Sequence, residues 1–295
     1  MKSVLITGAN SYIGTTFERW IQENAVGDIQ TETVDMIDES WKTKNFGAYD
    51  TIFHVAGIAH ADVGSVSEEQ KKLYYKVNTD LTVECATKAK SEGVKQFIFM
   101  SSIIVYGESA GIGKQRVITK NTPLTPANFY GDSKVKAEEG LFKLADENFK
   151  IVVLRPPMIY GKGSKGNYPL LAKMARKSPF FPNVQNQRSM LYIGNLCKFV
   201  ELMIRNEEQG VFFPQNKNYV QTSEMVRQIA EAHDKKIRLI KSVNWLLVSL
   251  GNRKCRISAL INKAFGNIVY EHEMSKYMEE YRVYDLEESI HLTEC

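Results

Sequence analysis

Tyr130 and Lys134 are the two residues of this 295-residue chain whose types and spacing are best suited to chemistry. They stand four positions apart, and four apolar residues follow them at helix spacing: Val135, Ala137, Leu141 and Leu144. A helix over this segment would place the phenol and the ammonium one turn apart on the same face. Taken alone, the pair also fits an ordinary exposed helix start.

Such a pair has a use in proton transfer. A tyrosine of ordinary pKa, about 10, is a poor acid–base group near neutrality. A positive charge ~4 Å away, at an effective dielectric of ~20, is worth ~4 kcal/mol. That energy corresponds to roughly three pKa units. We therefore expect Lys134 to lower the pKa of Tyr130 toward neutral pH.

A serine is predicted to complete a catalytic triad. Residues 96–100 have the composition of a buried parallel strand, and this strand delivers Ser101 and Ser102 at its carboxyl end. Open α/β sheets bind their ligands at that end. In the predicted triad the Ser102 hydroxyl binds the reacting oxygen, Tyr130 exchanges its proton, and Lys134 holds a ribose and tunes the phenol.

The N-terminal segment indicates what lies beside the triad. An apolar strand at residues 4–6, a glycine-bearing turn and a helical pattern from residue 12 form the layout of a dinucleotide-binding βαβ unit. Free amides at the helix start would face a pyrophosphate. The usual middle glycine is Ser11 here, whose hydroxyl can donate a hydrogen bond instead. The predicted cofactor contacts in this turn are Gly8, Asn10, Ser11, Tyr12, Ile13 and Gly14.

The next segment is compressed, with room for little more than a strand before the apolar run at 51–55. That run is predicted to be the fourth strand, closed by a turn whose cofactor contacts are Val55, Ala56 and Gly57. The acidic residue expected about 20 positions after the glycines is Asp28, Glu32 or Asp35. Asp35 and Met36 are the residues predicted to flank the adenine. No arginine is placed to meet a 2′-phosphate, which favours NAD over NADP.

Composition and residue spacing argue against several other classes of protein. The net charge of +4 is too small to indicate a nucleic-acid partner, and no apolar run approaches the length of a membrane span. Four scattered cysteines predict free thiols in a reducing cytoplasm. His54 and His60 lack a third metal ligand at suitable spacing, so no metal is expected. A histidine on a strand is more often packed or hydrogen-bonded, and Asn78 is likewise predicted to be a structural hydrogen-bonder.

Five motifs recur in an order that resembles a known family: T-G-x-x-S-x-x-G at 7–14, H-V-A-G at 54–57, S-S-I-I-V-Y-G at 101–107, Y-G-D-S-K at 130–134 and L-R-P-P-M-I-Y-G at 154–161. Together they resemble the extended short-chain dehydrogenase/reductases, the nucleotide-sugar epimerases, dehydratases and ketoreductases. The resemblance covers residues 1 to about 215. It implies an α/β fold, a Rossmann doubly wound parallel sheet that binds NAD(P), and a smaller C-terminal substrate-binding lobe.

The resemblance also implies a domain division and site residues. Residues 1–157 with about 190–214 would form the Rossmann domain, and 158–189 with 215–295 the nucleotide-sugar lobe. Ser102, Tyr130 and Lys134 match the family's catalytic residues, and Pro157 is expected at the cofactor. A homodimer formed through helices of the nucleotide domain is a further family expectation.

Residues 103 and 104 subdivide the family. Its 4,6-dehydratases carry an Asp-Glu pair there, and its fucose-type epimerase-reductases carry a cysteine at the position of Ile103, which is expected to line the substrate. Two isoleucines cannot transfer protons, so hydride transfer at one carbinol carbon remains. The favoured function is reduction of a UDP-4-keto-6-deoxy-N-acetylhexosamine to UDP-N-acetyl-fucosamine or -quinovosamine for capsule or O-antigen synthesis. The alternatives are a UDP-glucose or UDP-N-acetylglucosamine 4-epimerase and a non-catalytic NAD(P) sensor or scaffold.

Further along the chain the resemblance points to substrate contacts. The segment R-S-M-L-Y-I-G-N-L from Arg188 is similar to the family's R-D-Y-I-H-V-x-D-L, whose arginine contacts the nucleotide diphosphate. Asn167 and Phe181 are candidates for uracil contact.

The end of the chain separates its charges. Residues 235–270 hold eight Lys/Arg and no acid, while 271–295 hold eight Asp/Glu and two Lys/Arg. We expect these blocks to neutralise one another or to flank the solvent face. The alternatives are that Arg253 or Arg256 assists the diphosphate, or that the basic stretch, with Trp245, rests on an anionic membrane.

Overall fold

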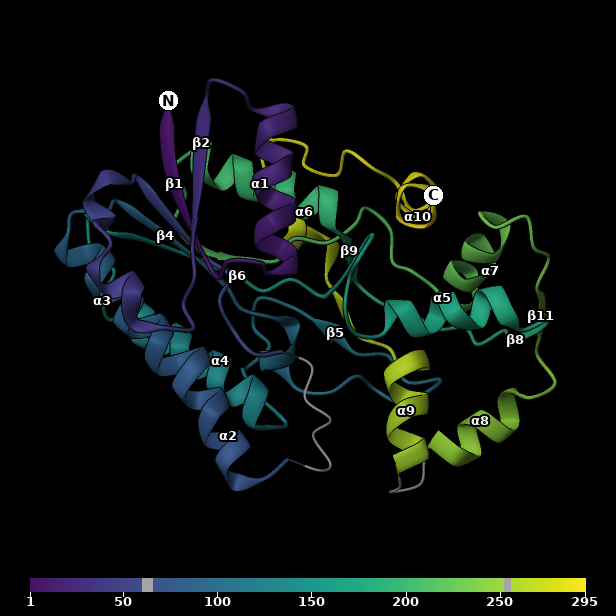
Figure 1. The fold of residues 1–295 in the computed structure, drawn as a ribbon. Helices are drawn as coiled ribbons and strands as arrows, with labels where there is room; N and C mark the ends of the chain where they lie inside the picture. Colours follow the sequence, from purple (N-terminus) through teal and green to yellow (C-terminus); the bar gives the residue numbers. More distant parts are fainter. Residues whose placement is uncertain (60–65, 252–255) are drawn as a thin grey trace.

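The computed structural model describes residues 1–59, 66–251 and 256–295. Its centre is a six-stranded parallel sheet with the strand order β10-β6-β4-β3-β1-β2 (Figure 1). The strands are β1 (Lys2–Thr7), β2 (Ile29–Val34), β3 (Thr51–His54), β4 (Gln96–Met100), β6 (Lys150–Leu154) and β10 (Gly210–Phe212). The sheet confirms the predicted Rossmann class.

Apolar side chains on alternate strand positions cover both faces of this sheet. Val4 and Ile6 point into the larger core with α1 (Tyr12–Asn24) and α6 (Ile193–Arg205), while Leu5 belongs to the core on the opposite face. That second face is covered by helices α3 (Leu81–Ser91) and α4 (Phe129–Phe142). A strand buried on both faces needs apolar residues at every position, which explains the unbroken runs in the sequence.

The chain crosses to the other side of β1 after β2, and this crossover sets the ligand crevice. β2 and β3 both pair with β1, on its two sides. Ligands of open α/β sheets bind at such a switch point, beyond the carboxyl ends of the strands. After β2, the compressed segment contains two 3₁₀ helices, Glu39–Thr43 and Phe46–Ala48, and no further strand. The prediction that residues 51–55 form the fourth strand was therefore wrong in its order, since the strand, Thr51–His54, is the third along the chain.

Further elements surround the sheet or extend beyond it into a lobe (Figure 1). Those nearer the sheet are α2 (Glu68–Tyr75), a π-helical turn (Lys76–Asp80), a 3₁₀ helix (Ile103–Tyr106), β5 (Val117–Ile118), β7 (Met158–Tyr160), β9 (Met190–Tyr192) and β12 (Val269–Tyr270). The lobe holds α5 (Tyr168–Lys177), β8 (Phe180–Pro182), α7 (Thr222–Glu231), β11 (Arg238–Ile240), α8 (Asn244–Gly251), α9 (Arg256–Phe265) and α10 (Leu286–Glu294). A 3₁₀ helix (His272–Ser275) follows β12, and its Met274 packs with Val105 and Tyr106. β8 pairs with β11, β7 with β9 and β5 with β12, each in parallel.

One hydrophobic core joins the sheet to the lobe. It runs without interruption from Val4 and Ile6 of β1 through α6 to Val226 of α7 and Ile290 of α10. The division into a nucleotide-binding domain and a substrate lobe therefore stays a proposal about function, since packing is continuous across it. Within the described residues no helix is both long enough and apolar enough to cross a membrane. Cys85, Cys197 and Cys295 are free, and Cys255 lies outside the described residues.

Candidate active site

The predicted catalytic serine and tyrosine lie in contact. Ser102 caps the 3₁₀ helix that follows β4, and its hydroxyl accepts a hydrogen bond of 3.3 Å from the amide of Ile104. Tyr130 stands in the first turn of α4, close enough for Ser102 to form a side-chain hydrogen bond with it. This contact depends on Gly131, because a Cβ there would lie 2.9 Å from the carbonyl oxygen of Ile104. The helix start and the serine loop can approach only where that side chain is missing.

The predicted direction of the Tyr130 pKa shift is wrong for this structure. Burial raises the pKa of Tyr130 to about 12, the hydrogen bond from Ser102 opposes this rise, and Tyr74 adds to it. The Tyr74 ring packs edge-on against Tyr130, with centroids 6.1 Å apart. The sequence argument assigned Lys134 a direct charge effect, but Lys134 is not among the causes of this shift, which desolvation of the phenol dominates. Tyr130 is therefore a neutral phenol near neutral pH.

Lys134 is buried on the same helix and faces the ends of β3 and β4. Its ammonium donates a 2.9 Å hydrogen bond to the carbonyl of Met100, the last residue of β4. A Cβ placed on Gly57, in the turn after β3, would lie 3.4 Å from that ammonium. Burial lowers the pKa of Lys134 to about 8, and Glu138 opposes this shift. The lysine therefore lies between the catalytic helix and the turn predicted to contact the cofactor.

The glycine turn after β1 has the shape that a dinucleotide requires. Gly8 has a φ of +102°, and a Cβ on it would lie 2.9 Å from the amide nitrogen of Ala56. The turns after β1 and β3 thus touch at the switch point. Ser11 caps α1 and accepts a 3.2 Å hydrogen bond from the amide of Gly14, so its oxygen is occupied while its proton remains free to donate.

The first turn of α1 has free backbone amides that fit a pyrophosphate. The amides of Tyr12 and Ile13 precede the first residue that can find an acceptor within the helix. The Tyr12 hydroxyl is buried and has no hydrogen-bond partner among the described residues. Burial raises the pKa of Tyr12. Asn10, with a φ of 61°, forms the exposed corner of the turn.

The adenine end of the predicted cofactor site is only partly as expected. Asp35 follows β2, and its carboxylate accepts a 2.9 Å hydrogen bond from the amide of Ile37. A carboxylate at this strand end suits a ribose hydroxyl. The side chain of Met36 is 8% exposed and packs in the core beneath α3, so it presents little surface to an adenine. Val55 and the buried Pro157 lie at the ends of β3 and β6.

Of the predicted substrate residues, one does not fit its role. Phe181 is 1% exposed and packs on Phe265 with ring centroids 5.6 Å apart, because β8 turns it into the core of the lobe. A uracil cannot reach a ring enclosed in this way, so that prediction is withdrawn. Asn167 precedes α5 and makes no side-chain cap to the helix. Ile103 is half-buried, directly after Ser102.

Arg188 is a partly buried cation without a carboxylate. It donates a 3.1 Å hydrogen bond to the carbonyl of Gly266, and none of the ion pairs among the described residues includes it. Burial lowers the pKa of Arg188 to about 10. A buried guanidinium normally has an anionic partner. This arrangement suits an anion such as a diphosphate. Arg253 and the side chain of Arg256 lie outside the described part of the chain.

His54 and Asn78 have the structural roles that the sequence predicted. The His54 ring bonds to the hydroxyls of Thr7 at 2.7 Å and Thr82 at 3.0 Å, and burial lowers its pKa to about 3. Asn78 joins the backbone of Ile58 to Ser133 of α4. It lies in the π-helical turn Lys76–Asp80, a rare geometry that is frequent near functional sites. His60 lies outside the described residues.

A buried ionic network behind the triad was missed from the sequence. Glu138, one turn after Lys134, is 2% exposed and accepts hydrogen bonds from Ser101 and from Arg155. Arg155 also donates a 2.7 Å hydrogen bond to the Tyr106 hydroxyl. The network connects β4, α4 and β6. Its signal was the i, i+4 spacing of Lys134 and Glu138, which places both on one helix face.

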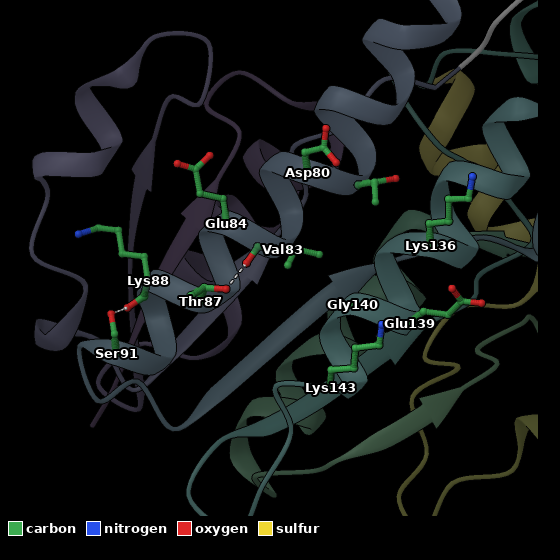
Figure 2. Close-up of a pocket in the computed structure, with 11 residues that line it drawn as sticks. Asp80, Val83, Glu84, Thr87, Lys88, Ser91, Lys136, Glu139, Gly140 and Lys143 are labelled. Carbon is green, nitrogen blue, oxygen red and sulfur yellow. Dashed lines mark hydrogen bonds between the residues drawn. The ribbon is translucent and has the colours of Figure 1, made fainter.

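One hollow lies away from this chemistry. It measures about 720 Å³ and lies between α3 and α4, lined by Asp80, Glu84, Lys136, Glu139 and Lys143 among others (Figure 2). Figure 2 shows charged side chains of both helices around it. These residues come from the exposed side of the helices that cover the sheet, whereas Ser102 lies just beyond the carboxyl end of β4. We therefore assign this hollow no part in catalysis.

Comparison with known proteins identifies the family. Residues 4–213 match the model of the NAD dependent epimerase/dehydratase family. The chain belongs to this family. It is therefore an enzyme of a family that uses NAD, as the motifs indicated. The chain is 34% identical over 261 residues to a UDP-glucose 4-epimerase of Vibrio cholerae, covering 79% of this chain and 76% of that one.

A second curated relative differs in its named substrate. The chain is 29% identical over 257 residues to the N-acetyl-α-D-glucosaminyl-diphospho-ditrans,octacis-undecaprenol 4-epimerase of Escherichia coli O157:H7, covering 80% of this chain and 73% of the relative. Among solved structures, a dTDP-4-dehydrorhamnose reductase of Clostridium acetobutylicum matches with a TM-score of 0.70 at 18% identity, over 99% of this chain and 98% of that one. A UDP-glucuronic acid 4-epimerase of Bacillus cereus in complex with NAD matches with a TM-score of 0.67 at 14% identity, over the same shares. These structures confirm the fold.

Proposed function

We propose that this enzyme is an NAD-dependent 4-epimerase of a diphospho-linked hexose or N-acetylhexosamine. The observation that carries the proposal is the contact of Ser102 with Tyr130 beside the buried Lys134, in a chain that matches two curated 4-epimerases over about four-fifths of its length. This was the alternative function at the level of sequence. The relatives favour it over the reductase.

In this proposal each residue of the triad has one task. The Ser102 hydroxyl holds the C4 oxygen of the sugar, and Tyr130 removes the proton from that oxygen and later returns it. Lys134 supplies a positive charge near the phenol and hydrogen-bonds a ribose. A bound NAD would supply the acceptor and donor of hydride for C4. Gly8, Ser11 and the first-turn amides of α1 would hold its pyrophosphate.

The residues after Ser102 restrict the chemistry to C4. Ile103 and Ile104 carry no titratable group, so the site has no second acid–base pair there for elimination of water at the neighbouring carbons. Exchange of configuration at C4 needs only the one proton that Tyr130 handles. On this account, neither dehydration nor epimerisation at carbons beside a ketone is expected.

A 4-ketoreductase is the second candidate, and the state of Tyr130 favours it. With a pKa of about 12, Tyr130 holds its proton at neutral pH, as the acid of a ketone reduction must. The substrate would be the UDP-4-keto-6-deoxy-N-acetylhexosamine inferred from the sequence, and the product UDP-N-acetyl-fucosamine or -quinovosamine. An epimerase must first lose that proton, so it needs the positive charges of Lys134 and of an oxidised nicotinamide near the phenol.

The two functions differ in cofactor balance, which gives the test. Purified enzyme is incubated with UDP-N-acetylglucosamine or UDP-glucose and without added NADH, and the products are resolved by chromatography. The proposal predicts the C4 epimer, with no net change in absorbance of the reduced nicotinamide. If no sugar is interconverted, while NADH or NADPH is oxidised stoichiometrically by the 4-keto sugar, the reductase is the function. Lys134→Met serves as the inactive control.

We also propose substrate contacts, a cofactor preference, a location and an oligomeric state for this enzyme. Arg188 would bind the diphosphate of the substrate, and Asn167 would contact its base. NAD is preferred over NADP, because Asp35 ends β2 and suits a free ribose hydroxyl. We place the enzyme in the cytoplasm, in the synthesis of a surface polysaccharide. We further propose a homodimer through the helices that line the hollow of Figure 2, to be checked by sedimentation velocity.

A further inference from the structure

Helix α8 is apolar on two sides, but only one side is packed. Leu247 lies against the main hydrophobic core, as expected for a helix at the edge of the lobe. On the other side Trp245 is 73% exposed, Leu246 43% and Val248 37%. Leu260 of the neighbouring α9 is 60% exposed. A surface helix normally turns polar residues to water, so this exposed face indicates a binding surface.

The surroundings of this face are cationic. Lys235, Lys236, Arg238, Lys241 and Lys263 are all exposed, and they lie on the strand and turn before α8 and on α9. Residues 235–270 contain no acidic residue at all. α8 and α9 pack on each other at the outer end of the lobe, away from β1 and β2 (Figure 1). The segment that carries the apolar face thus contains exposed cations and no acidic residue.

The acidic block at the end of the chain does not neutralise these cations in the described structure. Glu294 pairs with Arg176 and lies 2.6 Å from His233, and Glu273 pairs with Lys276. None of the ion pairs among the described residues includes Lys236, Arg238, Lys241 or Lys263. Of the two expected arrangements, mutual neutralisation is therefore not seen for these residues, while their exposure agrees with a solvent face.

We propose that the exposed face of α8, with Leu260 of α9 and the cations around it, docks on an anionic lipid bilayer. Trp245, Leu246 and Val248 would enter the interface between headgroups and acyl chains, where tryptophan is favoured. The cations would meet anionic headgroups, and each contributes about a fivefold gain in partitioning. We expect Lys235 to contribute less to lipid binding than the other cations, because its ammonium already donates a hydrogen bond to the carbonyl of Arg176.

Charge complementarity selects the bilayer over a second copy of the chain. A twofold interface places the same patch against itself. Here it would bring the cations of one copy toward those of the other, with no acid within 235–270 to pair with them. A bilayer offers both an apolar interior and a negative surface. Docking would bring the enzyme to a lipid-linked sugar if the substrate resembles that named for the E. coli relative, yet it does not depend on the proposed catalysis.

The test is vesicle binding by the whole protein without any sugar. Sedimentation compares vesicles of phosphatidylcholine with vesicles of phosphatidylcholine and phosphatidylglycerol in equal parts. Brominated lipid quenches the fluorescence of an inserted Trp245, while Trp41 is 2% exposed and Trp20 is held by a 2.9 Å hydrogen bond to Glu201. We expect binding to the anionic vesicles only, with quenching. Binding should weaken at high salt, since the Debye length shrinks from about 10 Å at 0.1 M to about 3 Å at 1 M.

Two variants and two matched controls test whether the apolar face and its cations are responsible for vesicle binding. Leu246→Ser with Val248→Ser should abolish quenching, and Lys236→Glu with Lys241→Glu should weaken binding about twentyfold or more. Leu292→Ser, at a leucine 46% exposed on α10, and Lys120→Glu, at an exposed lysine, should bind as the parent does.

Three results would overturn the proposal. The first is failure of the parent protein to bind anionic vesicles, and the second is equal loss of binding in the control variants. The third is a change of oligomeric state in Leu246→Ser with Val248→Ser, which would show that a second copy covers the face. Turnover of a soluble UDP-sugar should stay within about twofold in every variant. If a variant of the apolar face lost turnover but still bound vesicles, the face would belong to the substrate cleft. That result would also contradict the proposal.

Discussion

Replacing Glu138 by glutamine should destabilise the protein and change the pH range in which it works. Glu138 is enclosed by Ser101 and Arg155, and Arg155 is 8% exposed. Glutamine keeps the shape of the side chain but removes the negative charge. The guanidinium of Arg155 is then left buried without a negative charge, beside the Tyr106 hydroxyl and the Phe213 ring.

The magnitude of the destabilisation is set by burial. Breaking a buried ion pair by removing one partner costs about 3–5 kcal/mol, because the remaining charge is desolvated without compensation. We expect Glu138→Gln to lower the free energy of unfolding by about that amount. Glu139→Gln, at the exposed neighbouring residue, should change it by less than about 0.5 kcal/mol. Replacing both partners, Glu138→Gln with Arg155→Met, should cost less than the two single changes added together.

The kinetic consequence has a definite sign. Glu138 raises the pKa of Lys134, which burial has lowered to about 8. Without Glu138 the pKa of Lys134 falls further, so the lysine loses its proton at a lower pH. The alkaline limb of kcat/KM should therefore move to lower pH in Glu138→Gln and stay in place in Glu139→Gln.

Urea denaturation measures the first effect, and a pH series of sugar interconversion measures the second. A loss below about 1 kcal/mol would show that water or another group compensates Arg155. An unmoved alkaline limb in a folded Glu138→Gln protein would refute the assigned influence of Glu138 on Lys134.

Three further changes have expected outcomes. Gly8→Ala forces a φ of +102° on alanine and places a Cβ 2.9 Å from the amide of Ala56, so calorimetry should show NAD affinity at least about tenfold lower. Burial lowers the pKa of His54 to about 3 in the folded protein. As the pH falls below 6.5, His54 therefore takes up a proton only in the unfolded chain. Stability should thus fall by about 2 kcal/mol from pH 6.5 to 5, and His54→Leu should flatten that slope in urea titrations. Arg188→Met should raise KM for the diphospho-sugar about tenfold or more with kcat within about threefold, and an unchanged KM would remove Arg188 from the substrate site.

The parallel sheet and the proximity of Ser102 to the helix of Tyr130 and Lys134 could be predicted from the sequence because each has a strong local signal. The unbroken apolar run at Gln96–Met100 indicates a buried strand, so Ser101 and Ser102 must appear at the carboxyl edge of the sheet. Tyr130 and Lys134 share a helix, so their relation is set by one turn of backbone. Short-range geometry of this kind survives folding largely unchanged.

Properties that depend on the surroundings of a group could not be predicted in this way. The Tyr130 pKa shift had the wrong sign, since desolvation by neighbouring segments exceeds the effect of a charge on the same helix. Phe181 was a candidate for uracil contact, but β8 pairs with β11 and turns its ring inward. The role of Glu138 could not be predicted, because its partner Arg155 is distant along the chain. Burial and long-range pairing arise only from the assembled fold.

The central claim is that a serine-bound tyrosine moves the proton of the reacting oxygen. The measurement that tests it most directly compares Tyr130→Phe with the parent enzyme in NAD binding and in C4 interconversion of a UDP-sugar. The account predicts unchanged NAD affinity and a rate lower by about 10²–10⁴-fold. A Tyr130→Phe enzyme that binds NAD and turns over within about tenfold of the parent rate would contradict it.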